Sequence, residues 1–185
     1  MFYNNPLLKK VICEYEMFRA HMTDMFAFCP ELEEITLFIN EAKNINLDNF
    51  LYNTPKLSKF TTIHEDYVVI QPSSMLHTFE NTGLTDVPFE LNMTLLTPES
   101  CNAAFKNSSV ENIRFTSNSI PAGLWAFTNV GSTAGTMGDC SNWNVATINS
   151  VISAFQDLRN TNKDGIVYFP KIWESKLGTS VANMV

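Results

Sequence analysis

Charged residues are scarce in this chain of 185 residues: Asp, Glu, Lys and Arg together make up 17% of it, against about 25% in a typical soluble domain. The sequence contains no run of Lys or Arg, and its formal net charge is -7. Nucleic-acid-binding proteins need a basic surface that displaces counterions from the phosphates. The composition therefore predicts no nucleic-acid partner, and it disfavours an anionic membrane surface for the same reason.

Long hydrophobic runs are also missing. No segment approaches the ~20 consecutive apolar residues that a membrane-spanning helix needs, so we expect no membrane insertion. The opening residues, Met-Phe-Tyr-Asn-Asn-Pro, lack the basic and apolar regions of a signal peptide. Three explanations stay open: the protein remains where it is made, it is exported by another route, or it is one piece of a longer chain.

Cysteine is present but in no metal-binding pattern. The four cysteines form no C-x-x-C pair, and no His stands at metal-ligand spacing to them: Cys13, Cys29, Cys101 and Cys140. Isolated cysteines of this kind behave as small, buried core residues. The sequence therefore predicts core positions for them, no metal site and no cofactor.

Motifs of catalysis are absent as well. The chain has no Gly-rich phosphate loop, no G-x-S-x-G and no H-E-x-x-H. The one cluster of catalytic residue types is His64-Glu65-Asp66, where neighbouring side chains of an extended segment point in opposite directions. We interpret it as a solvated loop and predict no catalytic residue and no enzymatic activity. An enzyme with a site near His64 is the weakest alternative.

What the chain does have is an internal repeat. Residues 2–11 align with residues 51–60 without a gap, residues 26–35 fall in the same frame, and two further copies fit with one residue deleted. The first aliphatic position recurs every 24 to 27 residues, at Leu8, Leu32, Leu57, Leu84 and Val110. A sixth, degenerate copy begins at Phe127.

Each copy follows the spacing L-x-x-L-x-L, whose last two positions alternate as in a short strand with one buried face. These inward pairs are Val11/Cys13, Ile35/Leu37, Phe60/Thr62, Val87/Phe89 and Ile113/Phe115. One strand per repeat, stacked in parallel, predicts a solenoid with a sheet along one side. The extra residues 40–47 and 66–72 are expected to be variable arms, with a brief additional strand at residues 67–70.

Two further columns belong to the other side of each coil. An aromatic or aliphatic column predicts an internal spine: Phe2, Phe26, Leu51, Phe79, Phe105 and Phe127. Apolar residues four positions earlier, such as Met22 and Met75, fit one turn of helix. Asn follows the spine by two residues in five copies, with Phe28 as the exception, and an Asn in a tight bend bonds nearby backbone groups.

The repeat fades after residue 130, and a different pattern follows. Thr147 is expected to cap a helix that carries Ile148, Val151, Ile152 and Phe155 on one face. A short strand at residues 166–169 and a last helix at residues 171–177, stopped by Gly178, complete this part. Its tryptophans are predicted to be core residues. We interpret residues 131–185 as a C-terminal cap on a solenoid of residues 1–130.

The segments Met25-Phe-Ala-Phe-Cys-Pro-Glu-Leu-Glu-Glu-Ile35 and Met1-Phe-Tyr-Asn, with Ala104-Phe-Lys-Asn and Ala126-Phe-Thr-Asn, resemble the BspA-type leucine-rich repeats. The resemblance covers roughly residues 1 to 130. It implies a recognition protein of a bacterial surface or a phage virion, attached to tails or fibres. The fold implies a binding surface and names no ligand.

The outward face of the sheet is the predicted partner-binding surface. Its residues are Glu34, Thr36, Phe38, Lys59, Thr61, Asp86, Asn112 and Arg114. One interpretation is a charge ladder in which Lys10, Glu34, Lys59 and Asp86 satisfy one another across strands. The other is a strip for a partner, anchored by Phe38 and Ile63 and helped by Arg, because aromatic and Arg side chains dominate interface energetics.

The sequence as a whole predicts an α/β fold: a leucine-rich-repeat solenoid of about six coils, with a parallel sheet on one face and a small α/β cap. The expected function is non-enzymatic attachment, as a virion or bacterial-surface adhesin that binds a protein or glycan on a host. The alternative is a structural decoration or scaffold subunit, docked on neighbouring virion or surface subunits through an uncapped N-terminal coil.

Overall fold

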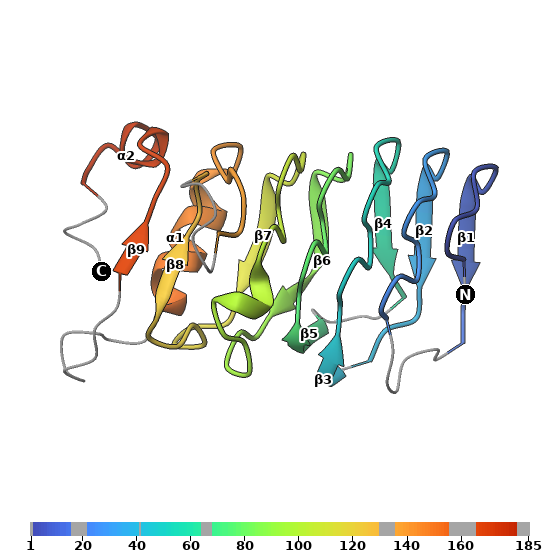
Figure 1. The fold of residues 1–185 in the computed structure, drawn as a ribbon, viewed down its shortest axis with the longest axis horizontal. Coiled ribbons are helices and arrows are strands. Elements are labelled where there is room, and N and C mark those ends of the chain that lie inside the picture. The colour runs from blue at the N-terminus through green and yellow to red at the C-terminus, as the bar shows by residue number, and fades with distance from the viewer. Residues whose placement is uncertain are drawn as a thin grey trace.

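Short parallel strands, stacked coil upon coil, form the body of the protein in the computed structural model (Figure 1). The structure describes residues 2–15, 22–40, 42–63, 68–129, 136–155 and 166–180. The strands are β1 (Lys10–Cys13), β2 (Glu34–Leu37), β3 (Ala42–Asn46), β4 (Lys59–Thr62), β5 (Val68–Ser74), β6 (Asp86–Leu91), β7 (Asn112–Phe115), β8 (Leu124–Ala126) and β9 (Ile166–Tyr168).

The predicted parallel-sheet solenoid is confirmed. Val11 of β1 pairs with Ile35 of β2, which pairs with Phe60 of β4, in the register that the repeat requires. All three side chains are buried, whereas Lys10 and Lys59 beside them are exposed. The described residues form about four turns, fewer than the six coils that the sequence predicts.

The strands belong to more than one sheet, which the sequence does not predict. One sheet has the order β1-β2-β4, a second has the order β3-β5-β6-β7, and β8 pairs with β9. The arms between repeats supply the additional strands. The brief strand expected at residues 67–70 is part of β5, with residue 67 outside the described residues, and β3 was missed.

Pro88 explains why β4 and β6 are not joined. Lys59 and Ile63 donate their backbone N–H groups to carbonyls of the preceding coil, at 3.2 and 2.8 Å. The backbone N–H of Thr61, between them in the strand, therefore points to the same coil. Pro88 occupies the equivalent position of β6 and has no N–H to donate. Within the described residues the ladder of hydrogen bonds is interrupted here, and β6 pairs with β5 and β7 instead.

The side of each coil opposite these strands is built from turns, and the expected helical turn is wrong there. Residues four apart adopt left-handed backbone conformations, such as Asp24 and Phe28 with φ of 55° and 58°. Successive N–H groups alternate between two kinds of acceptor. The Met25 N–H bonds within the turn at 3.2 Å, and the Phe26 N–H bonds to the next coil at 3.1 Å. Left-handed residues cannot continue a helix, and each tight turn still satisfies its backbone groups.

The predicted spine lies between the two sides and forms the core. Phe26, Leu51, Phe79, Phe105 and Phe127 are all buried. The rings of Phe79 and Phe105 stack at 5.1 Å, as those of Phe2 and Phe26 do at 5.4 Å. Where Leu51 interrupts the aromatic column, the neighbouring Phe50 packs against Phe26 at 5.5 Å.

The last part of the chain packs on the end of this core. It contains α1 (Val145–Ala154) and α2 (Ile172–Leu177), whereas the 3-10 turn η1 (Glu99–Cys101) lies within the solenoid, ahead of β7. The cap of α1 is Asn144, whose side chain accepts from the Thr147 N–H at 2.9 Å, so the expected Thr147 cap is wrong. Gly178 ends α2 in a left-handed conformation, as predicted.

Helix α1 occupies the place of the next strand beside β7. Thr147 Oγ1 accepts from the Ile113 N–H at 3.0 Å, and Ser150 Oγ accepts from the Phe115 N–H at 2.7 Å. The same hydroxyls donate to the carbonyls of Glu111 and Phe115. Two side chains on successive turns of a helix thus satisfy the open edge of a parallel sheet.

Candidate interaction surface on the strand face

Strands β1, β2 and β4 satisfy their own polar groups on the outward face. Glu34 lies between two lysines, with Lys10 Nζ at 2.7 Å and Lys59 Nζ at 2.8 Å. Hydrogen bonds from Lys10 and then Lys59 lower the pKa of the Glu34 carboxyl. Thr36 and Thr61 bond to each other at 3.0 Å. Four of the eight predicted partner-binding residues therefore bond within this ladder.

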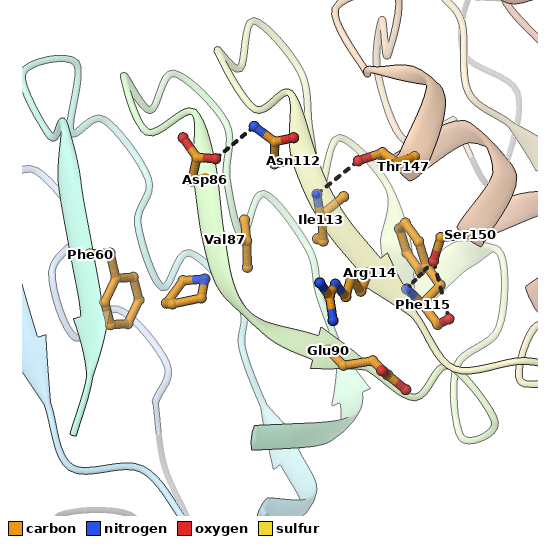
Figure 2. Close-up of a pocket in the computed structure, with 12 residues that line it drawn as sticks. Phe60, Asp86, Val87, Glu90, Asn112, Ile113, Arg114, Phe115, Thr147 and Ser150 are labelled. Carbon is orange, nitrogen blue, oxygen red and sulfur yellow. Dashed lines mark hydrogen bonds between the residues drawn. The ribbon is translucent and has the colours of Figure 1, made fainter. Parts of the chain in front are cut away.

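Three others come together in a pocket of about 470 Å³ between β4, β6, β7 and α1 (Figure 2). Asp86, Asn112 and Arg114 line it. The remaining lining residues are Phe60, Val87, Pro88, Glu90, Ile113, Phe115, Ala146, Thr147 and Ser150. The eighth predicted residue, Phe38, follows β2 and does not line this pocket.

The interruption at Pro88 places this pocket where it is. Phe60 lies on β4 and Val87 on β6, so the two sides of the gap supply apolar walls (Figure 2). Arg114 is exposed on β7 and is the register partner of Glu90 on β6. The repeat pattern predicted Phe60 and Val87 only as inward residues of their strands. The contribution of Thr147 and Ser150 had no sequence signal, because it depends on how α1 packs.

Hydrogen bonds fix the carboxylates at the rim of the pocket. Asp86 accepts from Asn112 Nδ2 and from Thr85 Oγ1, each at 2.6 Å. Asn112 in turn accepts from the Asn144 amide. Glu90 accepts from the Thr116 hydroxyl. Neutral donors thus orient both carboxylates, and Arg114 of β7 lines the same pocket.

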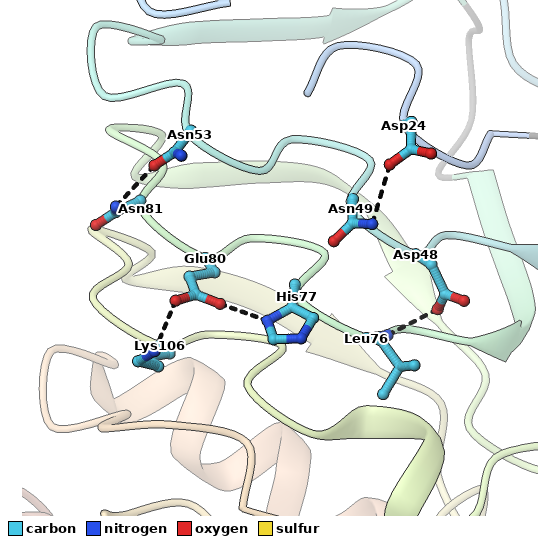
Figure 3. A network of polar contacts seen from close by, with 9 residues as sticks. All are labelled: Asp24, Asp48, Asn49, Asn53, Leu76, His77, Glu80, Asn81 and Lys106. Carbon is cyan, nitrogen blue, oxygen red and sulfur yellow. Dashed lines mark hydrogen bonds and ion pairs between the residues drawn. The ribbon is translucent and has the colours of Figure 1, made fainter. Parts of the chain in front are cut away.

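A second polar network crosses the coils on the turn side (Figure 3). The buried Glu80 carboxylate pairs with His77 Nδ1 at 2.5 Å and with Lys106 Nζ at 2.8 Å. The hydrogen bond to Glu80 raises the pKa of Lys106. A buried carboxylate needs such partners. No Ser, Thr or Cys side chain is bonded to His77 in the described structure, so this cluster has the geometry of a structural network.

The sequence also pointed to a cluster of catalytic residue types and to the question of a metal site. His64, Glu65 and Asp66 lie outside the described residues. Within the residues that are described, no three His, Cys, Asp or Glu side chains come together as a metal site. In the same part of the chain, neither helix has the length and hydrophobicity to span a bilayer.

The cysteines differ sharply in accessibility, which gives a first prediction. All four are free, and Cys29, Cys101 and Cys140 are buried whereas Cys13 is half-buried. Burial raises the pKa of the three buried thiols, and the thiolate is the reactive form. We expect iodoacetamide to label Cys13 first in the native protein, as followed by peptide mass mapping. Labelling of Cys101 at the rate of Cys13 would contradict the fold.

Comparisons of the chain with protein-family models, with curated protein sequences and with solved structures gave no match. The geometry of the pockets and the chemistry of the exposed surfaces are therefore what bears on function.

Proposed function

We propose that this chain is a non-enzymatic recognition protein whose strand-face pocket binds a polypeptide segment of a partner. The observation that supports this most directly is the pocket at the Pro88 interruption, which combines apolar walls with two fixed carboxylates and an exposed Arg. Its volume of about 470 Å³ lies within the range of ligand sites. It is also large enough for one or two side chains of a partner.

The rigidity of the strands and the helix around the strand-face pocket favours binding. The pocket residues lie on strands and a helix that hydrogen bonds tie together, so little conformational entropy is lost on association. The Asp86 and Glu90 carboxylates suit a basic side chain, and Arg114 suits a carboxylate. The apolar walls at Phe60 and Val87 suit an aliphatic or aromatic anchor. A segment with an apolar anchor between two charges of opposite sign fits this arrangement.

We further propose that the solenoid is of the leucine-rich-repeat type, related to the BspA class. The L-x-x-L-x-L spacing and the spine support this. We place the protein on a virion, in a tail or fibre, or on a bacterial surface, where its partner is a host protein or glycan. The resemblance of the Met-Phe and Ala-Phe segments supports that placement.

The test is selection of peptides from a displayed library of random 12-residue sequences on the wild-type chain. Selected peptides are then measured by calorimetry against the variants Arg114→Ala and Glu90→Gln. We expect at least a tenfold weaker Kd for Arg114→Ala, as for a central interface arginine. Lys10→Ala, on the neighbouring self-satisfied ladder, is the matched control and should leave the Kd unchanged.

Two results would contradict the proposal. One is that the wild-type chain selects no peptide. The other is that selected peptides bind Arg114→Ala, Glu90→Gln and Lys10→Ala as tightly as the wild type, since the pocket would then not be the binding surface.

The second candidate is a structural decoration or scaffold subunit that docks through the first coil. The exposure of that coil favours it: within the described residues β1 pairs only with β2, and Leu7 and Ile12 are 83% and 56% exposed. Such an edge invites pairing. Light scattering after size-exclusion chromatography tests it. An oligomer that Ile12→Lys dissociates supports docking, and a wild-type monomer at high concentration argues against it.

A further inference from the structure

A second pocket, of about 320 Å³, lies at the loops that lead into β1, β2 and β4, away from the strand-face pocket. Three successive coils line it with the same two positions each. The lining residues are Asn4, Pro6, Phe28, Pro30, Asn53 and Pro55. None of them carries a charge, and none lines the strand-face pocket.

Phe28 is the unusual residue of this pocket. It occupies the column that Asn fills in the other coils, and it shares their left-handed backbone, with φ of 58° against 54° at Asn4. Asn tolerates this conformation, but a bulky aromatic residue there is a genuine outlier. Phe28 is nevertheless 37% exposed. A strained backbone at a partly exposed aromatic residue suggests function.

Neighbouring aromatic side chains hold the Phe28 ring in place. Tyr3 meets it edge to face at 5.7 Å, and Tyr52 does so at 5.0 Å from the next coil. Both contacts are edge to face, with interplanar angles of 88° and 89°, and of the three rings only that of Phe28 lines the pocket. Lys56, which follows Pro55, pairs with Glu31 at 2.7 Å. The pocket therefore offers one fixed aromatic ring and no charged side chain in its lining.

Asn side chains in this column can hydrogen bond from one coil to the next, and we call this series the Asn ladder. The amides on either side of Phe28 lose their partners in it. In the following coils Asn81 Nδ2 donates to Asn53 Oδ1 at 2.8 Å (Figure 3). Phe28 has no amide, so Asn53 Nδ2 has no acceptor in the ladder and Asn4 Oδ1 has no donor. Within the described residues neither atom makes a hydrogen bond inside the chain. A donor and an acceptor thus flank the exposed ring.

We propose that this pocket binds a neutral oligosaccharide. A sugar ring offers C–H groups that pack on an aromatic face, and its hydroxyls both donate and accept, which matches Asn4 and Asn53. Coils repeat at roughly 4.8 Å, a step close to the length of one sugar unit in an extended chain. An acidic or basic ligand would find no countercharge among the lining residues.

A proline-rich peptide is the competing ligand, because aromatic grooves also bind polyproline helices. Its prolines carry carbonyl acceptors and no N–H donors. It can accept from Asn53 Nδ2 but offers no N–H to Asn4 Oδ1, whereas sugar hydroxyls can do both. The pair of amides therefore favours the oligosaccharide.

The experiment uses the full chain, with cellohexaose, mannohexaose and chitohexaose as probes in isothermal calorimetry and decaproline as the competing ligand. The decisive variant is Phe28→Asn, which restores the residue that the left-handed turn prefers and so preserves the fold. Its Tm, measured by circular dichroism, should equal or exceed that of the wild type. We expect one hexasaccharide to bind the wild type and to bind Phe28→Asn about tenfold or more weakly.

The matched control is Arg114→Ala in the strand-face pocket, which should bind the hexasaccharide as the wild type does. This result is independent of the peptide selection, so either proposal can fail alone. The inference is overturned if no hexasaccharide binds the wild type, if Phe28→Asn binds as tightly, or if decaproline binds while the sugars do not.

Discussion

Replacing Trp143 by Ala is expected to lower the free energy of unfolding by about 3–5 kcal/mol, the usual cost of removing a buried large aromatic side chain. Trp143 is 1% exposed. Its ring lies 5.2 Å from that of Phe105 in the spine and 5.5 Å from that of Trp173 in α2. It therefore joins the solenoid core to the C-terminal elements, and its loss opens a cavity between them.

The measurement is urea denaturation of the wild type, Trp143→Ala and Trp143→Phe, followed by far-ultraviolet circular dichroism. Trp143→Phe keeps an aromatic ring and should cost less than Trp143→Ala. Leu7→Ala, at an 83% exposed position, is the control and should change the midpoint little. A Trp143→Ala midpoint equal to that of Leu7→Ala would show that the two parts of the core do not depend on each other.

Removing both hydroxyls that cover the edge of β7 should also be severe. In the double variant Thr147→Val and Ser150→Ala, the N–H groups of Ile113 and Phe115 lose their acceptors. An unsatisfied buried group costs about 1–3 kcal/mol, so we expect a loss of roughly 2–6 kcal/mol for the pair. The bared edge is also a template for pairing with another chain, so the variant should aggregate at lower concentration.

Ser153→Ala is the matched control, because Ser153 Oγ bonds to the Ser150 carbonyl of its own helix and not to β7. Thr147→Ser retains the hydroxyl and should behave nearly as the wild type. Denaturation midpoints and light scattering at increasing concentration provide the readouts. If the double variant matches Ser153→Ala in both, the helix does not serve as the edge of this sheet.

The two surfaces depend on departures from the repeat. Pro88 cannot donate a hydrogen bond to β4, and the strand-face pocket lies at that gap. Phe28 cannot continue the Asn ladder, and the second pocket lies at that interruption. In each case the residue that departs from the repeat interrupts a series of hydrogen bonds between coils. The interruption leaves polar groups or apolar surface available to a partner. Regular positions, such as Glu34 between its two lysines, are instead satisfied within the chain.

The sequence by itself determined the parallel strands, the register of β1, β2 and β4, and the spine, because one buried strand face and one core column recur in every copy. It also determined α2 with its Gly178 stop, since that signal is local. It misplaced the cap of α1, where Thr147 resembled a cap but Asn144 supplies it. The helical turns were wrong because spacing by four fits a helix and also fits two consecutive tight turns.

Only the tertiary structure decided which outward residues meet. The predicted strip of eight residues was one surface in the sequence, yet Glu34, Thr36, Lys59 and Thr61 bond to one another and Asp86, Asn112 and Arg114 line a pocket. That division depends on the gap at Pro88 and on the packing of α1. Both involve hydrogen bonds between residues far apart in the chain, which a periodic pattern of side chains does not encode.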